Sequence, residues 1–388
     1  MLFTMGAIAT IPYGMPITME YAAPLSAIGI VAVFFARIDP LHRWSTVTIW
    51  PPLVVLASYG VSIWCSDYSQ LAFERSVSMP LFAMVCITVQ IVGWHRRALR
   101  GVLWSAAIAV VVMAADVLAH RVTGTPLFSS VGKAYGERLS GSQGNPNDLA
   151  AASILMPLGL AVLPRTRYML WHILFVCIGA VPWILSVSRQ TLIGWVIAIL
   201  VMTKSKYSFR TSLIVGGLLT LLLIAVMVAI PVVRERALLT WNTGLGIREA
   251  VFAFGCSLAW ENPFVGIGPG VFGEYYVPAA MEGWSWRGTP LRQYGMPWVH
   301  NLPLEVCIEL GGIGAVAFGS VVVGSVRQLR RGIRENTSNA YIATAVLAAL
   351  AATLVMGLVD LSLIKDWVRC LFWLVVGMSY GVGRPDRP

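Results

Sequence analysis

The sequence has few charged residues, which make up only 12% of the chain. Hydrophobic residues make up 57%, and the mean hydropathy is +0.74. A soluble globule of 388 residues with this composition would expose more apolar surface than soluble proteins carry. The composition therefore predicts an all-α polytopic membrane protein in which residues 1–388 form a single membrane domain.

Paired cysteines are also missing. The six cysteines are scattered about one to a segment, without CxxC pairs or histidines at metal-ligand spacing, so we expect neither a disulfide framework nor a metal site. Nothing in the sequence indicates a cofactor. The net charge of +10 does not predict nucleic-acid binding, because no basic run is interleaved with aromatic residues.

Apolar runs of the length that crosses a bilayer, about 20 residues, recur along the whole chain. The sequence opens without a charged segment and a small-residue cleavage site, so we expect the first run to be a span and not a signal peptide. The runs predict twelve spans with both termini on one side, at 2–17, 20–36, 46–64, 78–94, 101–119, 149–164, 168–186, 190–203, 211–232, 301–323, 341–361 and 365–382.

Lysine and arginine concentrate in alternate connections between these runs, which indicates that those connections are cytoplasmic. They are 37–45, 95–100, 165–167, 204–210, 327–334 and the tail after 382. Both termini are then cytoplasmic, and the long connections 120–148 and 233–300 lie on the outer side. Within the second loop, apolar residues at helical spacing predict an amphipathic helix over 246–260, lying at the outer interface.

Three arginines on the outer side are candidates for binding an anion. Arg138 precedes the predicted sixth span, Arg189 occupies a short turn between two spans, and Arg248 opens the amphipathic helix. The planar guanidinium group stays charged and can donate two hydrogen bonds to a phosphate. The alternative is that these side chains only snorkel to the interface or pair with nearby acids.

His300 stands at the start of the tenth predicted span, where a neutral imidazole could take a proton from an attacking hydroxyl. Asn301, Glu305 and Glu309 follow at intervals of four, so a helix would place them on one stripe below the histidine. The two glutamates could hold arginines, orient His300 or bind an acceptor, and the spacing does not choose among these roles. A hydrogen-bonded structural histidine is the alternative for His300.

The remaining ionisable residues near span ends indicate pairing more than chemistry. Asp366 and Arg369 are three residues apart on a predicted helix and should form an ion pair; the others are Asp116, Asp360 and Lys365. The glycines of "GIGPG" at 266–270 follow no predicted strand, so they predict a backbone turn toward the bundle and not a nucleotide-binding loop.

Four stretches resemble, in order and spacing, the motifs of the bacterial O-antigen ligase and polymerase superfamily. They are "RLSGSQGNPNDLA", "SRQTLIGW", "GIREAVFAFGCSLAWENPFVGIGPGVF" and "HNLPLEVCIELGGIGA", which together cover about residues 136–316. The spans on either side match only in hydropathy.

The resemblance implies a metal-independent membrane glycosyltransferase in the bacterial inner membrane, with its site facing the periplasm. Its donor would be a glycan on a polyprenyl pyrophosphate and its acceptor lipid A-core or another glycan. By the same resemblance, Arg189 and Arg248 would bind the pyrophosphate, and His300 would activate the acceptor. Many relatives have tryptophan where this chain has Phe252, a difference that bears on packing.

Two other functions stay open at this point. A polymerase would join repeat units that remain on the lipid carrier, and the motifs do not separate it from a ligase. A transporter or flippase commonly has twelve spans with both ends inside, but such proteins tend to show related halves, and no half-repeat is evident in this sequence.

Overall fold

The structure is a computed structural model of the chain. It describes residues 48–93, 96–128, 134–135, 138–143, 145–151, 154–163, 169–186, 188–204, 214, 225, 234–235, 247–291, 298–335, 339–360, 363 and 365–382. The spans predicted at 2–17 and 20–36 lie outside these residues, and the one at 211–232 lies almost wholly outside them.

The described part is helical apart from two short hairpins and the connections. Its helices are α4 (Trp50–Cys65), α5 (Ser69–Ser76), α6 (Met79–Gly93), α7 (Arg96–Thr123), α8 (Pro146–Ala151), α9 (Leu155–Leu160), α10 (Met169–Ser186), α11 (Arg189–Lys204), α14 (Ile247–Glu261), α15 (Phe272–Met281), α16 (Leu302–Arg334), α17 (Ala340–Gly357) and α18 (Asp366–Val382), with a 3-10 turn η2 (Gly141–Gln143). The hairpins pair β1 (Ala134–Tyr135) with β2 (Arg138–Leu139), and β3 (Ser285–Trp286) with β4 (Thr289–Pro290).

Four stretches of the described residues are long and apolar enough to cross a bilayer: Ser69–Ile91, Leu99–Thr123, Leu302–Arg334 and Ala340–Gly357. Shorter apolar helices cover Trp50–Cys65, Trp171–Ser186, Gln190–Lys204 and Val368–Val382. An all-α membrane architecture is therefore supported, while the count of twelve spans stays a prediction. Within the span expected at 149–164, the described residues contain the end of α8 and all of α9, each of which has a proline near its start.

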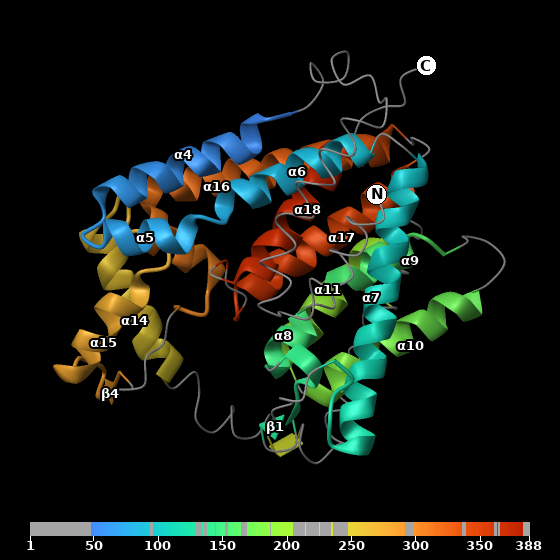
Figure 1. Cartoon of the computed structure of the whole chain (residues 1–388), viewed down its shortest axis with the longest axis horizontal. Coiled ribbons are helices and arrows are strands. Elements are labelled where there is room, and N and C mark those ends of the chain that lie inside the picture. The colour runs from blue at the N-terminus through green and yellow to red at the C-terminus, as the bar shows by residue number, and fades with distance from the viewer. Residues whose placement is uncertain are drawn as a thin grey trace.

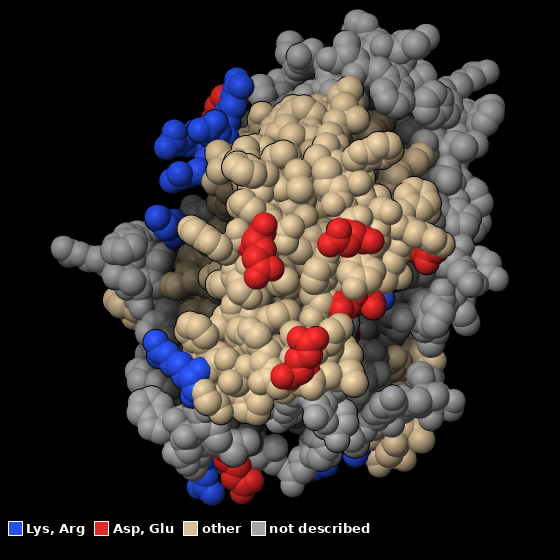
Figure 2. Space-filling model, turned by 90° about the vertical axis from the view of Figure 1, so that its left-hand side faces the viewer, with Lys and Arg blue, Asp and Glu red and all other residues tan. Residues whose placement is uncertain are grey.

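The apolar helices pack into one bundle. Helix α6 lies against α18, α16 lies against α4 and α17, and α11 lies against α17, while α7 packs on α9 and α10 (Figure 1). Helices α5, α14 and α15 collect at one end of the bundle, at the left of Figure 1. That end exposes the acids Asp67, Glu74, Glu261 and Glu282, and Figure 2 shows acidic side chains spread over it.

The predicted amphipathic helix at 246–260 is confirmed as a helix, α14. Val251, Phe254 and Leu258 are buried in an apolar cluster that α14 shares with α15. Glu249 and Trp260 are exposed. The helix therefore buries the stripe that its sequence spacing predicts.

Helix α16 begins at a well-formed cap and breaks one third of the way along. The Asn301 side chain accepts a hydrogen bond from the Leu304 backbone N–H, which caps the helix. At Gly311 the backbone has φ 64° and ψ −165°, a conformation that only glycine adopts readily. The freed backbone groups there pair with residues 263–268, for example Gly312 N–H to Pro263 O at 2.8 Å and Gly268 N–H to Glu309 O at 3.1 Å.

This pairing shows what the "GIGPG" glycines do. Gly266, Gly268 and Gly270 all have positive φ, and a side chain at Gly266 would lie 2.4 Å from the backbone of Glu309. The segment therefore turns back onto the bundle, as the sequence indicates.

A buried carboxylate anchors the first long loop. Asp116 of α7 accepts hydrogen bonds from the backbone N–H groups of Leu127 and Ser142, at 2.8 and 2.7 Å, and from the Ser142 hydroxyl at 2.7 Å. Its partners are thus backbone and hydroxyl groups. The contacts fix the chain immediately before Asn145, where the first segment of the candidate site begins.

The ion pair predicted between Asp366 and Arg369 is confirmed, with Arg369 Nη1 2.9 Å from Asp366 Oδ1. Arg369 is only 2% exposed, and it also donates to the Ser78 hydroxyl and to the Arg75 carbonyl. The pair fixes the start of α18 against the turn between α5 and α6.

Candidate functional site

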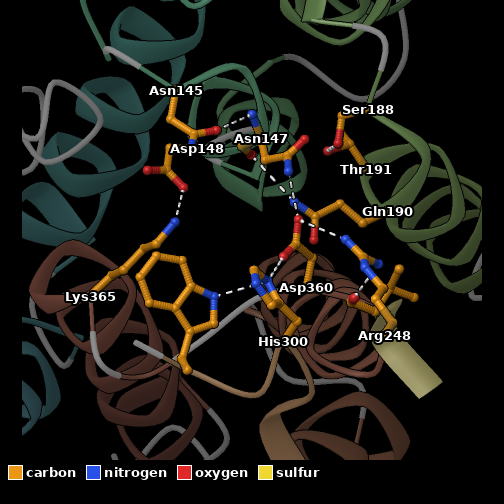
Figure 3. A network of polar contacts seen from close by, with 12 residues as sticks. Asn145, Asn147, Asp148, Ser188, Gln190, Thr191, Arg248, His300, Asp360 and Lys365 are labelled. Carbon is orange, nitrogen blue, oxygen red and sulfur yellow. Dashed lines mark hydrogen bonds and ion pairs between the residues drawn. The ribbon is translucent and has the colours of Figure 1, made fainter. Parts of the chain in front are cut away.

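A polar network joins segments that are far apart in the sequence (Figure 3). It lies where several helices of the bundle begin, and it is held by hydrogen bonds and ion pairs between side chains. Its members are Asn145, Asn147 and Asp148 around the start of α8, Ser188, Gln190 and Thr191 at the start of α11, Arg248 in α14, Trp298 and His300 before α16, Asp360 after α17 and Lys365 before α18.

Asp360 is the centre of this network. One carboxylate oxygen, Oδ1, is hydrogen-bonded to His300 Nδ1. The other, Oδ2, accepts a hydrogen bond from Asn147 Nδ2 at 2.6 Å. Arg248 Nη2 lies 3.7 Å from Oδ2. The Asp360 side chain is only 8% exposed, so these contacts replace most of its hydration.

Burial by itself would raise the pKa of Asp360. The hydrogen bond and charge of His300 and the charge of Arg248 act in the opposite direction and are stronger together. The pKa of Asp360 is therefore lowered from its ordinary value, and the residue is a carboxylate at neutral pH.

Asp360 determines which nitrogen of His300 is free. Trp298 Nε1 also lies 2.9 Å from Nδ1, but Nδ1 cannot accept that proton while it donates its own to Asp360. We assign the Nδ1 proton to Asp360, because a hydrogen bond to a charged acceptor is the stronger of the two. Nε2 of the neutral ring is then unprotonated and can act as a base.

The backbone at His300 supports this position of the ring. The residue has φ 58°, in the left-handed region that few residues other than glycine adopt. Asn301 follows as the cap of α16, and its Nδ2 donates to the Leu358 carbonyl at 3.0 Å. The cap residue therefore connects the turn that carries His300 to the turn that carries Asp360.

Arg248 lies on the other side of Asp360. Its Nη1 donates to the Val359 carbonyl at 3.0 Å, and its side chain is 30% exposed. At 3.7 Å the contact with Asp360 is electrostatic and longer than a hydrogen bond. The guanidinium group is thus held in place by one backbone contact and keeps donors that can reach a ligand.

A second ion pair closes the network near Trp298. Lys365 Nζ forms an ion pair with Asp148 Oδ1 and lies 4.8 Å from the centre of the Trp298 ring. The side chains of Lys365 and Asp148 are 18% and 17% exposed. Burial raises the pKa of Asp148, and the charge of Lys365 offsets part of that effect.

The helices around the network add positive potential to it. The N-terminus of a helix carries a partial positive charge and unsatisfied N–H groups. The helices of ten or more residues that begin here, within the described part, are α11 at Arg189, α14 at Ile247, α16 at Leu302 and α18 at Asp366. An anion bound beside Arg248 would therefore meet several favourable dipoles.

The structure brings two of the predicted site residues together. Arg248 and His300 come together through Asp360, although 52 positions of sequence separate them. Arg189 is the first residue of α11, next to Gln190, and Arg138 is in β2; the side chains of both arginines lie outside the described residues.

Glu305 and Glu309, expected below His300, lie deeper in the bundle. Glu305 Oε1 accepts from the Leu363 backbone N–H at 2.8 Å, and Glu309 is 5% exposed, with its carbonyl bonded to the Ser62 hydroxyl. Within the described residues no cluster of acids, histidines and cysteines could hold a metal ion.

The sequence alone singled out Arg248 and His300 of this network, and the members that it missed include Asp360, Lys365, Asn147 and Gln190. Asp360 and Lys365 were interpreted as pairing residues at a helix turn, which is correct but incomplete. Their position on the same predicted outer side as His300 is the signal that could have grouped them. Asn147 and Gln190 carry no charge, and their sequence gives no sign of which segment they contact.

The fold and the apolar helices define an α-helical membrane protein with a buried polar site at one end of its bundle. No protein-family model matches the chain, and no curated protein matches it. The function must therefore be argued from the site itself.

Proposed function

We propose that the protein is a membrane glycosyltransferase of the O-antigen ligase type, which transfers a glycan from a polyprenyl pyrophosphate to a hydroxyl of lipid A-core. The observation that carries the proposal is a histidine oriented by a carboxylate, beside an arginine, at the end of apolar helices. This combination offers a base for a hydroxyl and a cation for a pyrophosphate.

In the proposed step the acceptor hydroxyl attacks the anomeric carbon of the donor sugar. His300 Nε2 takes the hydroxyl proton as the new bond between oxygen and carbon forms. The bond between the anomeric carbon and the pyrophosphate oxygen breaks, and its electron pair leaves with the pyrophosphate. Asp360 balances the positive charge that His300 gains.

Negative charge grows on the departing pyrophosphate during this step. Arg248 and the nearby helix N-termini stabilise that charge where little water competes. We assign Arg189 the same role, because it opens α11 directly before Gln190 of the network. Arg138 is proposed only as a further contact with the substrate.

We place the site at the periplasmic face of the bacterial inner membrane. Helix α16 supports this orientation, because His300 precedes its first residue while its last turns carry basic residues. Those are Arg327, Arg330, Arg331 and Arg334. The lipid tail of the donor would then stay in the bilayer while its pyrophosphate reaches the network.

The test uses the purified protein with a lipid-linked glycan and one of two acceptors, lipid A-core or a second lipid-linked repeat. A shifted lipid A-core band is the expected product. A lengthening ladder on the lipid carrier would identify a polymerase instead. No product with either acceptor from a folded protein would reject glycosyl transfer, and movement of intact lipid-linked glycan across vesicles would then favour a flippase.

A further inference from the structure

Gln190 has a buried amide oxygen without a partner. The residue is 4% exposed, and its Nε2 donates to the Asn147 carbonyl at 3.4 Å. Its Oε1 is fully buried and has no hydrogen-bond partner among the described residues. Buried polar groups are nearly always satisfied, so this oxygen indicates that something else donates to it.

The neighbours of Gln190 determine the direction of its amide. Because a carbonyl can only accept, the Asn147 carbonyl fixes the amide nitrogen on its own side and leaves Oε1 on the other. Figure 3 shows the amide reaching toward Asn147 and Asp360, within the network that holds Arg248 and His300. Asn147 in turn donates to Asp360, so Gln190 is connected to the carboxylate that orients the histidine.

The free oxygen selects the chemistry of its ligand. Pyrophosphate oxygens are acceptors at neutral pH and would be repelled by a carbonyl, so Oε1 is not suited to the leaving group. A sugar hydroxyl or an acetamido N–H would suit it. Of the two nearby residues in the sequence, Ser188 and Thr191, which are 2% and 0% exposed, the Thr191 hydroxyl donates to the Ser188 hydroxyl at 3.3 Å.

We infer that Gln190 Oε1 binds the C2 substituent of the first sugar of the donor, through a hydroxyl or an acetamido N–H. This inference rests on the proposed function. The sugar must lie between the pyrophosphate at Arg248 and the acceptor at His300, with its anomeric carbon next to both. The groups beside that carbon are the ring oxygen, which only accepts, and the C2 substituent, which can donate.

The experiment compares three lipid-pyrophosphate donors that carry a single sugar with a C2 hydroxyl, a C2 acetamido group or no C2 substituent. Wild type is expected to use the C2-deoxy donor roughly tenfold less efficiently than the better of the other two, as kcat/KM. The preferred C2 substituent identifies whether Gln190 Oε1 accepts a hydrogen bond from a hydroxyl or from an acetamido N–H.

Gln190→Met keeps the length of the side chain and removes the acceptor. It should lower kcat/KM for the preferred donor to the level of the C2-deoxy donor, so the ratio falls to about one. Gln70→Met is the matched control, because Gln70 is exposed on α5, where its side chain donates a hydrogen bond to Glu74. It should leave the ratio unchanged.

Gln190→Glu keeps an acceptor oxygen and should retain the preference, which makes it the second variant should the methionine variant fail to fold. Discrimination that survives in Gln190→Met, or is lost in Gln190→Glu, would overturn the inference and leave glycosyl transfer intact. Equal use of all three donors by wild type would mean that a buried water satisfies Oε1, and would also overturn it. No transfer from any donor by folded wild type would instead reject the proposed function.

Discussion

Replacing Asp360 by asparagine tests the proposed role of His300 most directly, because the change alters charge and donor pattern with almost no change in shape. If the new amide nitrogen takes the position of Oδ1, that nitrogen would donate to His300 Nδ1. The ring proton would then have to sit on Nε2, which removes the base. With the nitrogen at Oδ2, it would face the donor group of Asn147 and the guanidinium of Arg248. Neither orientation satisfies all the neighbours of Asp360.

The expected loss of turnover is large. A positioned base contributes roughly 10²- to 10⁴-fold, and a residue that sets its tautomer controls most of that factor. We therefore expect kcat of Asp360→Asn to fall by about 10²-fold or more. KM for the lipid-linked donor should change much less, because the pyrophosphate is assigned to arginines and helix N-termini.

Asp366→Asn is the matched control, because it also removes the carboxylate of a helix-end ion pair. Its partner, Arg369, is 2% exposed and lies outside the network. We expect a lower Tm in detergent and nearly unchanged kcat per folded molecule. If Asp360→Asn folds and turns over like wild type, or if both variants lose turnover in proportion to their Tm, the assignment of Asp360 and His300 is wrong.

Three further predictions concern charge, backbone and pH. Arg248→Ala should lower kcat by roughly 10²- to 10³-fold while Tm stays close to wild type, measured by glycan transfer; undiminished transfer would remove Arg248 from the site. Gly311→Ala should destabilise the protein by about 1–3 kcal/mol in thermal unfolding, because its φ of 64° and the Phe264 backbone 2.4 Å from the new Cβ oppose a side chain. Gly319→Ala, in open helical space, should cost nothing, and equal effects of the two changes would refute this explanation. The folded pKa of Asp360 lies below the ordinary 3.8, so its contribution to stability is present above that pH and lost as pH falls further. Tm should therefore drop more steeply below about pH 4 in wild type than in Asp360→Asn; identical profiles would contradict the lowered pKa.

Several elements could be predicted from sequence because their signals are local. The stripe Val251, Phe254 and Leu258 gives α14 within a residue at each end, and the spacing of Asp366 and Arg369 gives their ion pair. Both rest on contacts one helical turn apart, and helical periodicity fixes such contacts directly.

Other elements could not be predicted because they depend on a distant segment. The break of α16 at Gly311 is stabilised by pairing with residues 263–268, and apolar composition alone predicts an unbroken helix there. The stripe of Glu305 and Glu309 was predicted from the same helix, but the Glu305 carboxylate accepts from the Leu363 backbone N–H, which comes from elsewhere in the chain.

Local features of the sequence are enough to predict apolar helices and to select candidate polar residues near their ends. Its hydropathy predicts apolar helices, and its motifs identify Arg248 and His300 as candidates, because residue type and helical period are properties of one short segment. The meeting of Arg248 and His300 at Asp360, and the addition of Asn147, Gln190 and Lys365 to the network, are visible only in the folded chain. Those contacts follow from how helix ends pack against one another across the bundle, and packing between distant segments leaves no periodic trace in the chain.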